Sequence, residues 1–375
     1  MTDNILRNRI LKELAKISEQ GTLRKLCVPS GIDFSSNDYL CLAKDERLKK
    51  ALINGVKKEG IGSTASRLLR GQRNCFSRVE KQFANWKGTE GALYFSTGYQ
   101  ANIGLMQTFL GENDVVFSDE LNHASLIDGI RLSKAKKVIF SHCGTESLED
   151  LINSTRTNGQ KFLVTESLFS MDGDVAPLER YAQICRNTNT NLIIDEAHAV
   201  GLYGKRGSGL IEEFGIDDDV FLSVNTAGKA LGVSGAFVAG DNLTIDYLVN
   251  KCRSFIFSTA PLPAIADALI TAIAIIESES DRRNLLKKIC RNFNNLLSEN
   301  GFDAPDTATE IIPIVIGDSD EAVRVAKKMQ DHGFDVRAIR PPTVAEGTSR
   351  LRISLNVNLT EEILKEFIGK LREEI

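Results

Sequence analysis

Short apolar runs alternate with stretches of helical periodicity from about residue 46 to 240. Helical spacing is clear at 146–157 and 177–188, and the runs between helices are short and apolar. Strands separated by helices in this way are typical of a largely parallel sheet. We therefore predict an α/β fold with strands at 92–95, 115–118, 137–140, 162–166, 192–198, 220–224 and 235–240.

The pattern changes after about residue 262. A long helical stretch at 264–298 is followed by the strand-like segments IIPIVIG, DVRAI and RLRISL, which are mixed with helices. This mixture indicates a smaller α+β domain. Near the other end, residues 1–17 have helical spacing and GIDFSSNDYL reads as a short strand and turn. We predict three parts: an N-terminal helix and strand segment at 1–45, a large α/β domain at 46–260 and a small C-terminal α+β domain at 261–375.

Composition is that of an ordinary globular protein. Of 375 residues, 42% are hydrophobic and 26% charged, and a net charge of −4 gives no reason to expect nucleic acid or an anionic membrane as partner. No apolar run reaches the roughly 18 residues of a membrane helix, and the N-terminus lacks the apolar core of a signal peptide. The seven cysteines are scattered without a CxxC pair. We expect reduced thiols in a cytoplasmic protein, with neither a disulfide framework nor a metal site.

Unusual polar residues follow four of the predicted strands. STGYQANIG follows 92–95, SLFSMDGD follows 162–166, DEAH follows 192–194 and NTAGK follows 220–224. Ligands of open α/β sheets bind beyond the carboxyl ends of the strands. The pattern therefore predicts one site fed by several loops.

The DEAH sequence at 195–198 resembles the Mg²⁺-binding element of a helicase-type NTPase. That chemistry also needs GxxxxGK[ST] to hold the phosphates. Each Gly-Lys pair in the chain is followed by a residue other than Ser or Thr: Ala230, Arg206 or Leu371. No GxGxxG motif follows a strand either, so the nucleotide interpretation is set aside.

The same residues meet the needs of pyridoxal phosphate chemistry. Lys229 offers an amine for the aldehyde, and Asp195 a carboxylate that keeps the pyridine nitrogen protonated. His198 can hydrogen-bond the phenolic oxygen. The phosphate needs N–H groups at a helix start, which 96–99 can supply, and a hydroxyl such as that of Thr226.

Each of these residues also has a purely structural interpretation. Lys229 alone would be a solvated charge, Asp195 a helix N-cap, His198 a core histidine and Gly98 a turn glycine. His123, in ELNHAS, could cap a helix or pack. Their joint occurrence, in this order and at predicted strand ends, favours the cofactor interpretation.

Together with their flanking motifs, these residues resemble a known family, the α-oxoamine synthases of the fold-type I pyridoxal phosphate superfamily. The resemblance covers nearly the whole chain and implies a fold-type I transferase with pyridoxal 5'-phosphate as cofactor. The matching segments are DFSSNDYL at 33–40, GSTASRLLRG at 62–71, FSTGYQAN at 95–102, LNHASLIDG at 121–129, FSMDGD at 169–174, DEAHAVG at 195–201, TAGKALGVSGA at 226–236, IRPPTV at 339–344 and RLRISL at 350–355.

The resemblance assigns roles around the cofactor. Lys229 forms the Schiff base, His123 stacks on the ring, Asp195 pairs with the ring nitrogen and His198 with the phenolic oxygen. Ser170 lies beside the cofactor, and the phosphate side is formed by Gly98, Tyr99 and Thr226. The family works as homodimers with shared sites, so Ser258 and Thr259 are expected to reach the partner's phosphate.

The implied reaction is a decarboxylating condensation of an amino acid with an acyl thioester. Lys229, once freed, is the base that removes the α-proton. The segment at 338–344 resembles the members that join L-alanine to a pimeloyl thioester in biotin synthesis. By that resemblance Arg24 meets the distal carboxylate of the pimeloyl chain, and Thr343 contacts substrate.

The amino acid's carboxylate is expected to bind Arg352, with help from Arg340. Arg350, on the same face of its strand, could be a solvated edge-strand arginine.

The segments at 121–135 and 197–201 resemble the family's glycine acetyltransferases as closely as they resemble the members that use L-alanine, so glycine and acetyl-CoA remain an alternative. A non-catalytic member is a more distant one. Sequence does not distinguish CoA from an acyl carrier protein as carrier of the acyl group.

Overall fold

The computed structural model describes residues 4–305 and 308–375. Contacts divide the chain into two compact units. The large unit comprises Asn37–Ser170 and Asp174–Leu285, and the small unit comprises the segment up to Ser36, Met171–Gly173 and Leu286–Ile375.

This division differs from the predicted boundaries at 45 and 261, and residues 1–3 of the predicted first segment lie outside the described residues. The change from large to small unit falls inside α12 (Ser280–Glu299) because α11 (Ile265–Ser278) packs on helices of the large unit. The predicted helical stretch at 264–298 consists of two helices, because the backbone of Glu279 (ψ 57°) separates α11 from α12.

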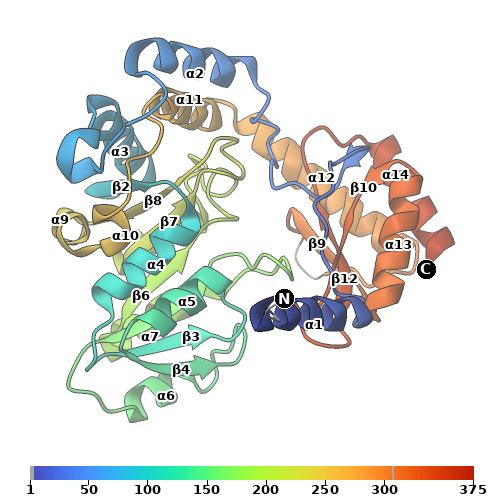
Figure 1. The fold of residues 1–375 in the computed structure, drawn as a ribbon, viewed down its shortest axis with the longest axis horizontal. Helices are drawn as coiled ribbons and strands as arrows, with labels where there is room; N and C mark the ends of the chain where they lie inside the picture. The colour runs from blue at the N-terminus through green and yellow to red at the C-terminus, as the bar shows by residue number, and fades with distance from the viewer. Residues whose placement is uncertain (1–3, 306–307) are drawn as a thin grey trace. The chain divides into compact units, whose positions relative to one another are not determined.

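The large unit is built on a seven-stranded sheet with the order β2-β8-β7-β6-β5-β3-β4 (Figure 1). All neighbours from β7 to β4 pair in parallel, and β8 is antiparallel to both β2 and β7. The predicted, mainly parallel α/β sheet is therefore confirmed. Its strands are β2 (Gly91–Phe95), β3 (Val115–Asp119), β4 (Lys136–Phe140), β5 (Lys161–Glu166), β6 (Asn191–Asp195), β7 (Val220–Thr226) and β8 (Ala236–Gly240).

Helices cover both faces of this sheet. In β8, Ala236 and Val238 join the core beneath α4 and α5, whereas Phe237 stacks on Phe83 of α3 with ring centroids 4.1 Å apart. Successive side chains of a strand point to opposite faces, so these contacts place a helical layer on each side. The helices are α2 (Glu46–Glu59), α3 (Asn74–Lys87), α4 (Gly98–Phe109), α5 (Ala124–Leu132), α6 (Leu148–Ser154), α7 (Leu178–Thr188), α8 (Leu210–Phe214), α9 (Asn242–Lys251) and α10 (Arg253–Ile256), with a π-helix at Arg67–Gly71 and a 3-10 turn at Asp217–Asp219.

The small unit contains an antiparallel sheet of order β11-β12-β9 and a short parallel pair, β1-β10. Phe34, just after β1, stacks on Phe367 of α14 at 4.3 Å, which ties the N-terminal segment to the C-terminal helix. No helix of the described ranges is long and apolar enough to cross a bilayer. The elements are α1 (Ile5–Glu19), β1 (Ile32–Asp33), β9 (Ile311–Gly317), α13 (Ser319–Asp331), β10 (Phe334–Asp335), β11 (Arg337–Ile339), β12 (Ser349–Ser354) and α14 (Glu361–Glu374).

Four parallel strands of the large unit end in polar residues. Asp119, Glu166, Asp195 and Thr226 are the last residues of β3, β5, β6 and β7. Parallel strands place their carboxyl ends at one edge of the sheet. These strand ends therefore bring polar residues to one edge of the sheet, as the sequence predicts.

Candidate active site

Lys229 lies in a tight loop between the antiparallel strands β7 and β8. Backbone hydrogen bonds from Ala227 N to Gly235 O (2.9 Å) and from Gly232 N to Lys229 O (2.8 Å) close the loop. Gly232 has φ +66°, and a Cβ there would lie 2.5 Å from the backbone nitrogen of Ala43. Only glycine fits such a close approach in this conformation. The small residues near Lys229 thus hold its backbone in one place.

The amine of Lys229 contacts His198, the residue predicted to bind the cofactor's phenolic oxygen. Its Nζ lies 2.6 Å from Nε2 of His198, and Nδ1 of the same ring lies 2.7 Å from the hydroxyl of Tyr39. His198 is buried. The three side chains come from separate segments, and the ring is held from both nitrogens.

Asp195 is buried at the end of β6 and is held by two hydrogen bonds. Its Oδ1 accepts from Ala197 N at 2.9 Å, and its Oδ2 accepts from Asn102 Nδ2 at 2.7 Å. Asn102 belongs to α4 and also donates to Ser125 Oγ at 2.9 Å. A carboxylate fixed in this way is ready to pair with a cation.

His123 is the N-cap of α5. Its Nδ1 accepts from Ser125 N at 3.2 Å and lies 2.7 Å from Ser125 Oγ. Because Nδ1 accepts a backbone N–H, the ring proton resides on Nε2. Desolvation lowers the pKa of His123, so the neutral imidazole predominates near pH 7.

Glu166 is a buried carboxyl that the sequence did not single out. It pairs in parallel register with Asp195 on the adjacent strand, and both are at most 4% exposed. Burial, and next the charge of Asp195, raise the pKa of Glu166 well above its ordinary value, although Lys229 and the backbone N–H of His123 oppose the shift. Glu166 therefore holds its proton to a higher pH than an ordinary carboxyl does.

The start of α4 lies against the end of β7. A Cβ on Gly98 would lie 2.7 Å from Thr226 Oγ1, so the helix start and the hydroxyl form a close cradle that a larger residue would fill. Thr97 caps α4 by accepting from Gln100 N at 3.1 Å. The hydroxyl of Tyr99 donates to Asp128. Free N–H groups at a helix start, beside a hydroxyl, suit a phosphate.

Ser170 lies in the loop after β5, which is closed by an antiparallel bridge between Leu168 and Val175. All the predicted cofactor residues belong to the large unit: Lys229, His198, Asp195, His123, Gly98, Tyr99, Thr226 and Ser170.

The predicted carboxylate-binding arginine belongs to the small unit. Arg352 is buried in β12 and donates from Nη1 to Ser354 Oγ at 2.7 Å. The solvated edge-strand interpretation of Arg350 is wrong: β12 is the central strand of its sheet, and Arg350 is buried and paired with Asp172.

The small unit also contains three other residues assigned to the substrates: Arg24, Thr343 and Arg340. Arg24 Nη2 donates to Thr343 Oγ1 at 3.2 Å, across more than 300 residues of sequence. Arg340 donates to the backbone oxygen of Gly21. Arg24 lines a cavity of about 860 Å³ together with residues of α1 and of the 341–347 segment. The basic group therefore borders a space large enough for an acyl chain.

Three residues of this site were missed from sequence. Tyr39 and Asn102 stand inside the motifs DFSSNDYL and FSTGYQAN, and Glu166 stands at the end of a predicted strand. Glu166 could have been found from sequence because it is a carboxylate at the end of a predicted strand, as Asp195 is. For Tyr39 and Asn102 no spacing rule links them to His198 and Asp195, because the contacts depend on the fold.

The comparisons with known proteins agree with this geometry. The sequence profile of the family described as aminotransferase class I and II matches residues 29–371. A structure of serine palmitoyltransferase from Sphingomonas wittichii superposes with a TM-score of 0.91 at 27% identity, covering 100% of this chain and 98% of the other. A high-resolution structure of SPT with PLP gives 0.91 at 26%, over 99% and 98%. The fold and the site define a fold-type I, pyridoxal phosphate-dependent enzyme.

More similar sequences narrow the class. The 8-amino-7-oxononanoate synthase of Lysinibacillus sphaericus is 40% identical over 98% of both chains, and that of Anaeromyxobacter dehalogenans is 43% identical over 87% of this chain and 81% of its own. The structure of 8-amino-7-oxononanoate synthase from Francisella tularensis has a TM-score of 0.81 at 31% identity, over 92% and 98% of the two chains. The chain belongs to the 8-amino-7-oxononanoate synthase family. The predicted α-oxoamine synthase resemblance and the predicted cofactor are confirmed.

Proposed function

We propose that this chain condenses L-alanine with a pimeloyl thioester, with loss of CO₂, to give 8-amino-7-oxononanoate for biotin biosynthesis. The observation that carries the proposal is the contact of Lys229 Nζ with His198, beside the fixed carboxylate of Asp195. Family membership, at about 40% identity over nearly the full length, supports the choice of reaction.

The residues of the large unit suit pyridoxal phosphate. Asp195, held by Asn102 and Ala197, would take the ring nitrogen, and His198 the phenolic oxygen. The cradle between Gly98 and Thr226, with Tyr99 in the same helical turn, would take the phosphate. Of the remaining predicted contacts, His123 would cover the ring and Ser170 would lie beside it. When bound, the cofactor supplies an aldehyde for amines and a ring that withdraws electrons from the substrate's α-carbon.

Lys229 is the proposed base. A free ε-amine accepts a proton, and His198 at 2.6 Å holds it in position. The neutral imidazole of His123 carries a proton on Nε2, which can be donated to a substrate carboxylate or thioester oxygen. The raised pKa of Glu166 disfavours a second negative charge beside Asp195, the proposed partner of the cofactor's ring nitrogen.

Residues of the small unit are proposed to choose the substrates. Arg352, with Arg340, would bind the α-carboxylate of alanine, because a guanidinium binds a carboxylate through two parallel hydrogen bonds. Arg24, which borders a cavity with Thr343 at hydrogen-bond distance, would meet the distal carboxylate of a pimeloyl chain. A monocarboxylic acyl group would leave that charge without a partner.

The test is a substrate screen on purified holoenzyme. L-Alanine should change the visible absorbance of the cofactor, and pimeloyl-CoA or pimeloyl acyl carrier protein should then be consumed with release of CO₂. Faster turnover with glycine and acetyl-CoA would move the chain to the glycine C-acetyltransferases. Binding of the cofactor without turnover of any pair would favour a non-catalytic member.

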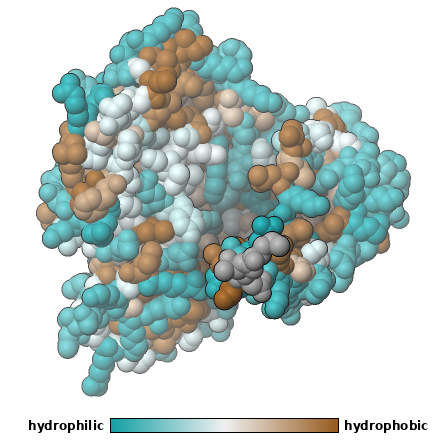
Figure 2. All heavy atoms as spheres, in the orientation of Figure 1, coloured by the Kyte–Doolittle hydropathy of each residue, from teal (hydrophilic) through white to brown (hydrophobic). Residues whose placement is uncertain are grey.

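We also propose a homodimer. Apolar side chains are exposed in the large unit: Ile61, Leu69 and Phe257 are 81%, 80% and 73% exposed. Figure 2 shows an apolar patch over α2 and α11, and Ile53 of α2 is 55% exposed. Contiguous exposed apolar surface marks an interaction site. Light scattering on the purified protein should give twice the mass of the chain.

A further inference from the structure

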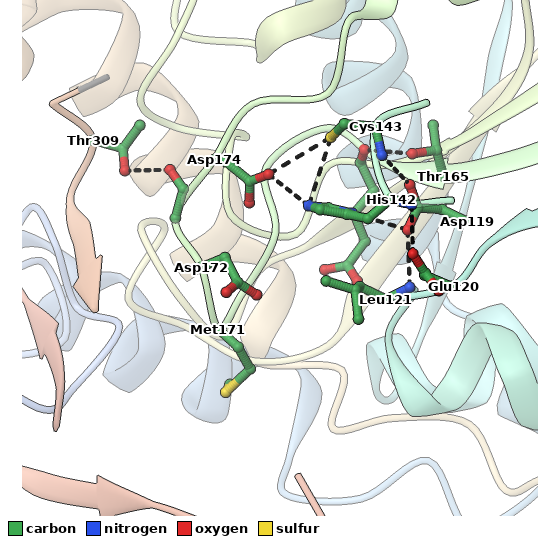
Figure 3. Close-up of polar contacts among 12 residues, drawn as sticks. Asp119, Glu120, Leu121, His142, Cys143, Thr165, Met171, Asp172, Asp174 and Thr309 are labelled. Carbon is green, nitrogen blue, oxygen red and sulfur yellow. Dashed lines mark hydrogen bonds and ion pairs between the residues drawn. The ribbon is translucent and has the colours of Figure 1, made fainter. Parts of the chain in front are cut away.

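A second cluster of reactive side chains lies at another part of the strand-end edge. It contains Asp119 at the end of β3, His142 and Cys143 just after β4, and Asp174 in the loop after β5 (Figure 3). His142 Nδ1 lies 3.0 Å from Asp119 Oδ1, and its Nε2 lies 2.6 Å from Asp174 Oδ2. Cys143 Sγ lies 3.7 Å from Nε2 of His142 and 3.6 Å from Oδ2 of Asp174. The proposed reaction uses none of these groups.

The cluster is held rigidly. Asp119 is 1% exposed and accepts from the backbone N–H groups of Leu121 (2.8 Å) and Cys143 (2.9 Å). The backbone oxygen of Asp174 accepts from Phe169 N at 3.0 Å, and the ring of Phe169 packs edge-on against His142 at 4.4 Å. The side chains of Asp119 and His142 are therefore held in place by the protein itself, and the other donor atoms lie within 4 Å of His142.

An independent observation points to a ligand. Tyr181 is 0% exposed, and within the described residues its hydroxyl has no hydrogen-bond partner. Its ring packs edge-on against that of Phe140, the last residue of β4 and two residues before His142, with ring centroids 5.9 Å apart. The second oxygen of Asp174, Oδ1, is also buried without a partner in the described part of the chain. Buried polar atoms are rarely left unsatisfied unless an ion or water completes the site.

We propose that this cluster is a binding site for a zinc-class divalent cation, with His142 Nε2, Cys143 Sγ and Asp174 Oδ2 as ligands. Nitrogen, thiolate and carboxylate ligands together suit zinc. With Zn–S about 2.3 Å and Zn–N about 2.0 Å, tetrahedral ligands stand about 3.5 Å apart, close to the 3.6 and 3.7 Å around Cys143. Only His142 and Asp174 must separate, by somewhat less than 1 Å, when the cation replaces the proton between them.

Two further groups complete this site. Asp119 binds the other ring nitrogen of His142, which is the usual carboxylate support of a zinc-bound histidine. The fourth position is left for a water, which would donate a hydrogen bond to the unpartnered Oδ1 of Asp174. The site would join the ends of β3 and β4 and the loop after β5 into one unit, and so would stabilise the large unit without taking part in the condensation.

Titration calorimetry with ZnCl₂ on chelator-treated holoenzyme tests the site. We expect one ion per chain. Cys143→Ser and Asp174→Asn should each weaken binding by about 100-fold and Asp119→Asn by about 10-fold. Cys41→Ser is the matched control, because Cys41 is also half-buried with a left-handed backbone, and it should bind zinc as the wild type does.

Cobalt(II) provides a second readout that is independent of variant folding. A wild-type holoenzyme that binds Co²⁺ should gain a thiolate-to-metal charge-transfer band, which Cys41→Ser retains. Absence of zinc binding in the wild type would overturn the proposal. So would equal affinity in wild type and Asp174→Asn, or a cobalt complex without the thiolate band.

Discussion

Glu166 and Asp195 end two adjacent parallel strands in register, and both carboxyl groups are almost fully buried. Burial raises the pKa of Glu166 well above its ordinary value, and the negative charge of Asp195 on the adjacent strand raises it further. The carboxyl of Glu166 therefore releases its proton only at a higher pH than an exposed glutamate would.

This relationship predicts a pH dependence of stability. Since the folded-state pKa of Glu166 is raised above its ordinary value of 4.5, the folded chain holds a proton that the unfolded chain releases as pH increases. The unfolding free energy of the cofactor-free protein should therefore fall above about pH 4.5, by up to about 1.4 kcal/mol per pH unit for this group. Glu166→Gln should flatten that slope in urea titrations, whereas the exposed Glu146→Gln should keep it. An unchanged slope in Glu166→Gln contradicts the assignment.

Lys229→Ala should remove turnover. The variant loses both the amine that anchors the cofactor and the proposed base, and a general base alone contributes about 10²–10⁴-fold. Borohydride reduction followed by peptide mapping should label Lys229 in the wild type and no residue in the variant. Lys205→Ala changes the other Gly-Lys pair of the large unit. This control variant should still be labelled at Lys229 and should keep wild-type activity. A label on a different lysine would show that the site is misassigned.

Tyr39→Phe should reduce kcat by about 3- to 10-fold, because loss of one hydrogen bond, worth about 1 kcal/mol, frees the ring of His198 to turn. The cofactor's visible absorbance should shift as well, since His198 is the proposed partner of its phenolic oxygen. Tyr94→Phe, which deletes another buried hydroxyl contact (to Ser234 O, 2.8 Å), controls for the general loss of stability. If both variants lower kcat equally without a spectral change, Tyr39 has no specific role.

Arg24→Ala should raise the KM for the pimeloyl thioester by about 10- to 100-fold, as expected for loss of a hydrogen-bonded charge contact of about 1.5–3 kcal/mol. Alanine binding should change little. Steady-state kinetics with each substrate varied in turn separates the two effects, and Lys25→Ala provides the neighbouring basic control. Equal losses for both substrates would argue against a contact with the acyl chain.

Lys87→Met should destabilise the large unit by about 3–5 kcal/mol, because Lys87 and Glu196 form an ion pair in which both side chains are at most 1% exposed. Removing one partner leaves a buried charge alone. Urea unfolding should show this loss, and the double variant Lys87→Met with Glu196→Gln should recover part of it. An exposed pair, tested by Lys49→Met, should change the unfolding free energy by less than about 1 kcal/mol.

The sequence by itself determined the order of strands and helices in the large unit, and it selected Lys229, Asp195, His198 and His123 as candidate site residues. Period-2 and period-3.6 patterns are local, and the polar motifs directly follow the apolar strands that position them. It did not determine that β8 runs antiparallel or that the helix at 264–298 breaks at Glu279. These features depend on which surfaces the strand and helix can bury.

Only the tertiary structure decided which distant residues meet. Tyr39 reaches His198 across 159 residues. Asp119, His142 and Cys143 converge, and Asp174 contacts the latter two, although no metal-ligand spacing is present in the sequence. It also made β12 a central strand, which buries Arg350 and gives it Asp172 as a partner. Contacts of this kind come from the strand order of a sheet, which a local pattern of apolar and polar residues does not encode.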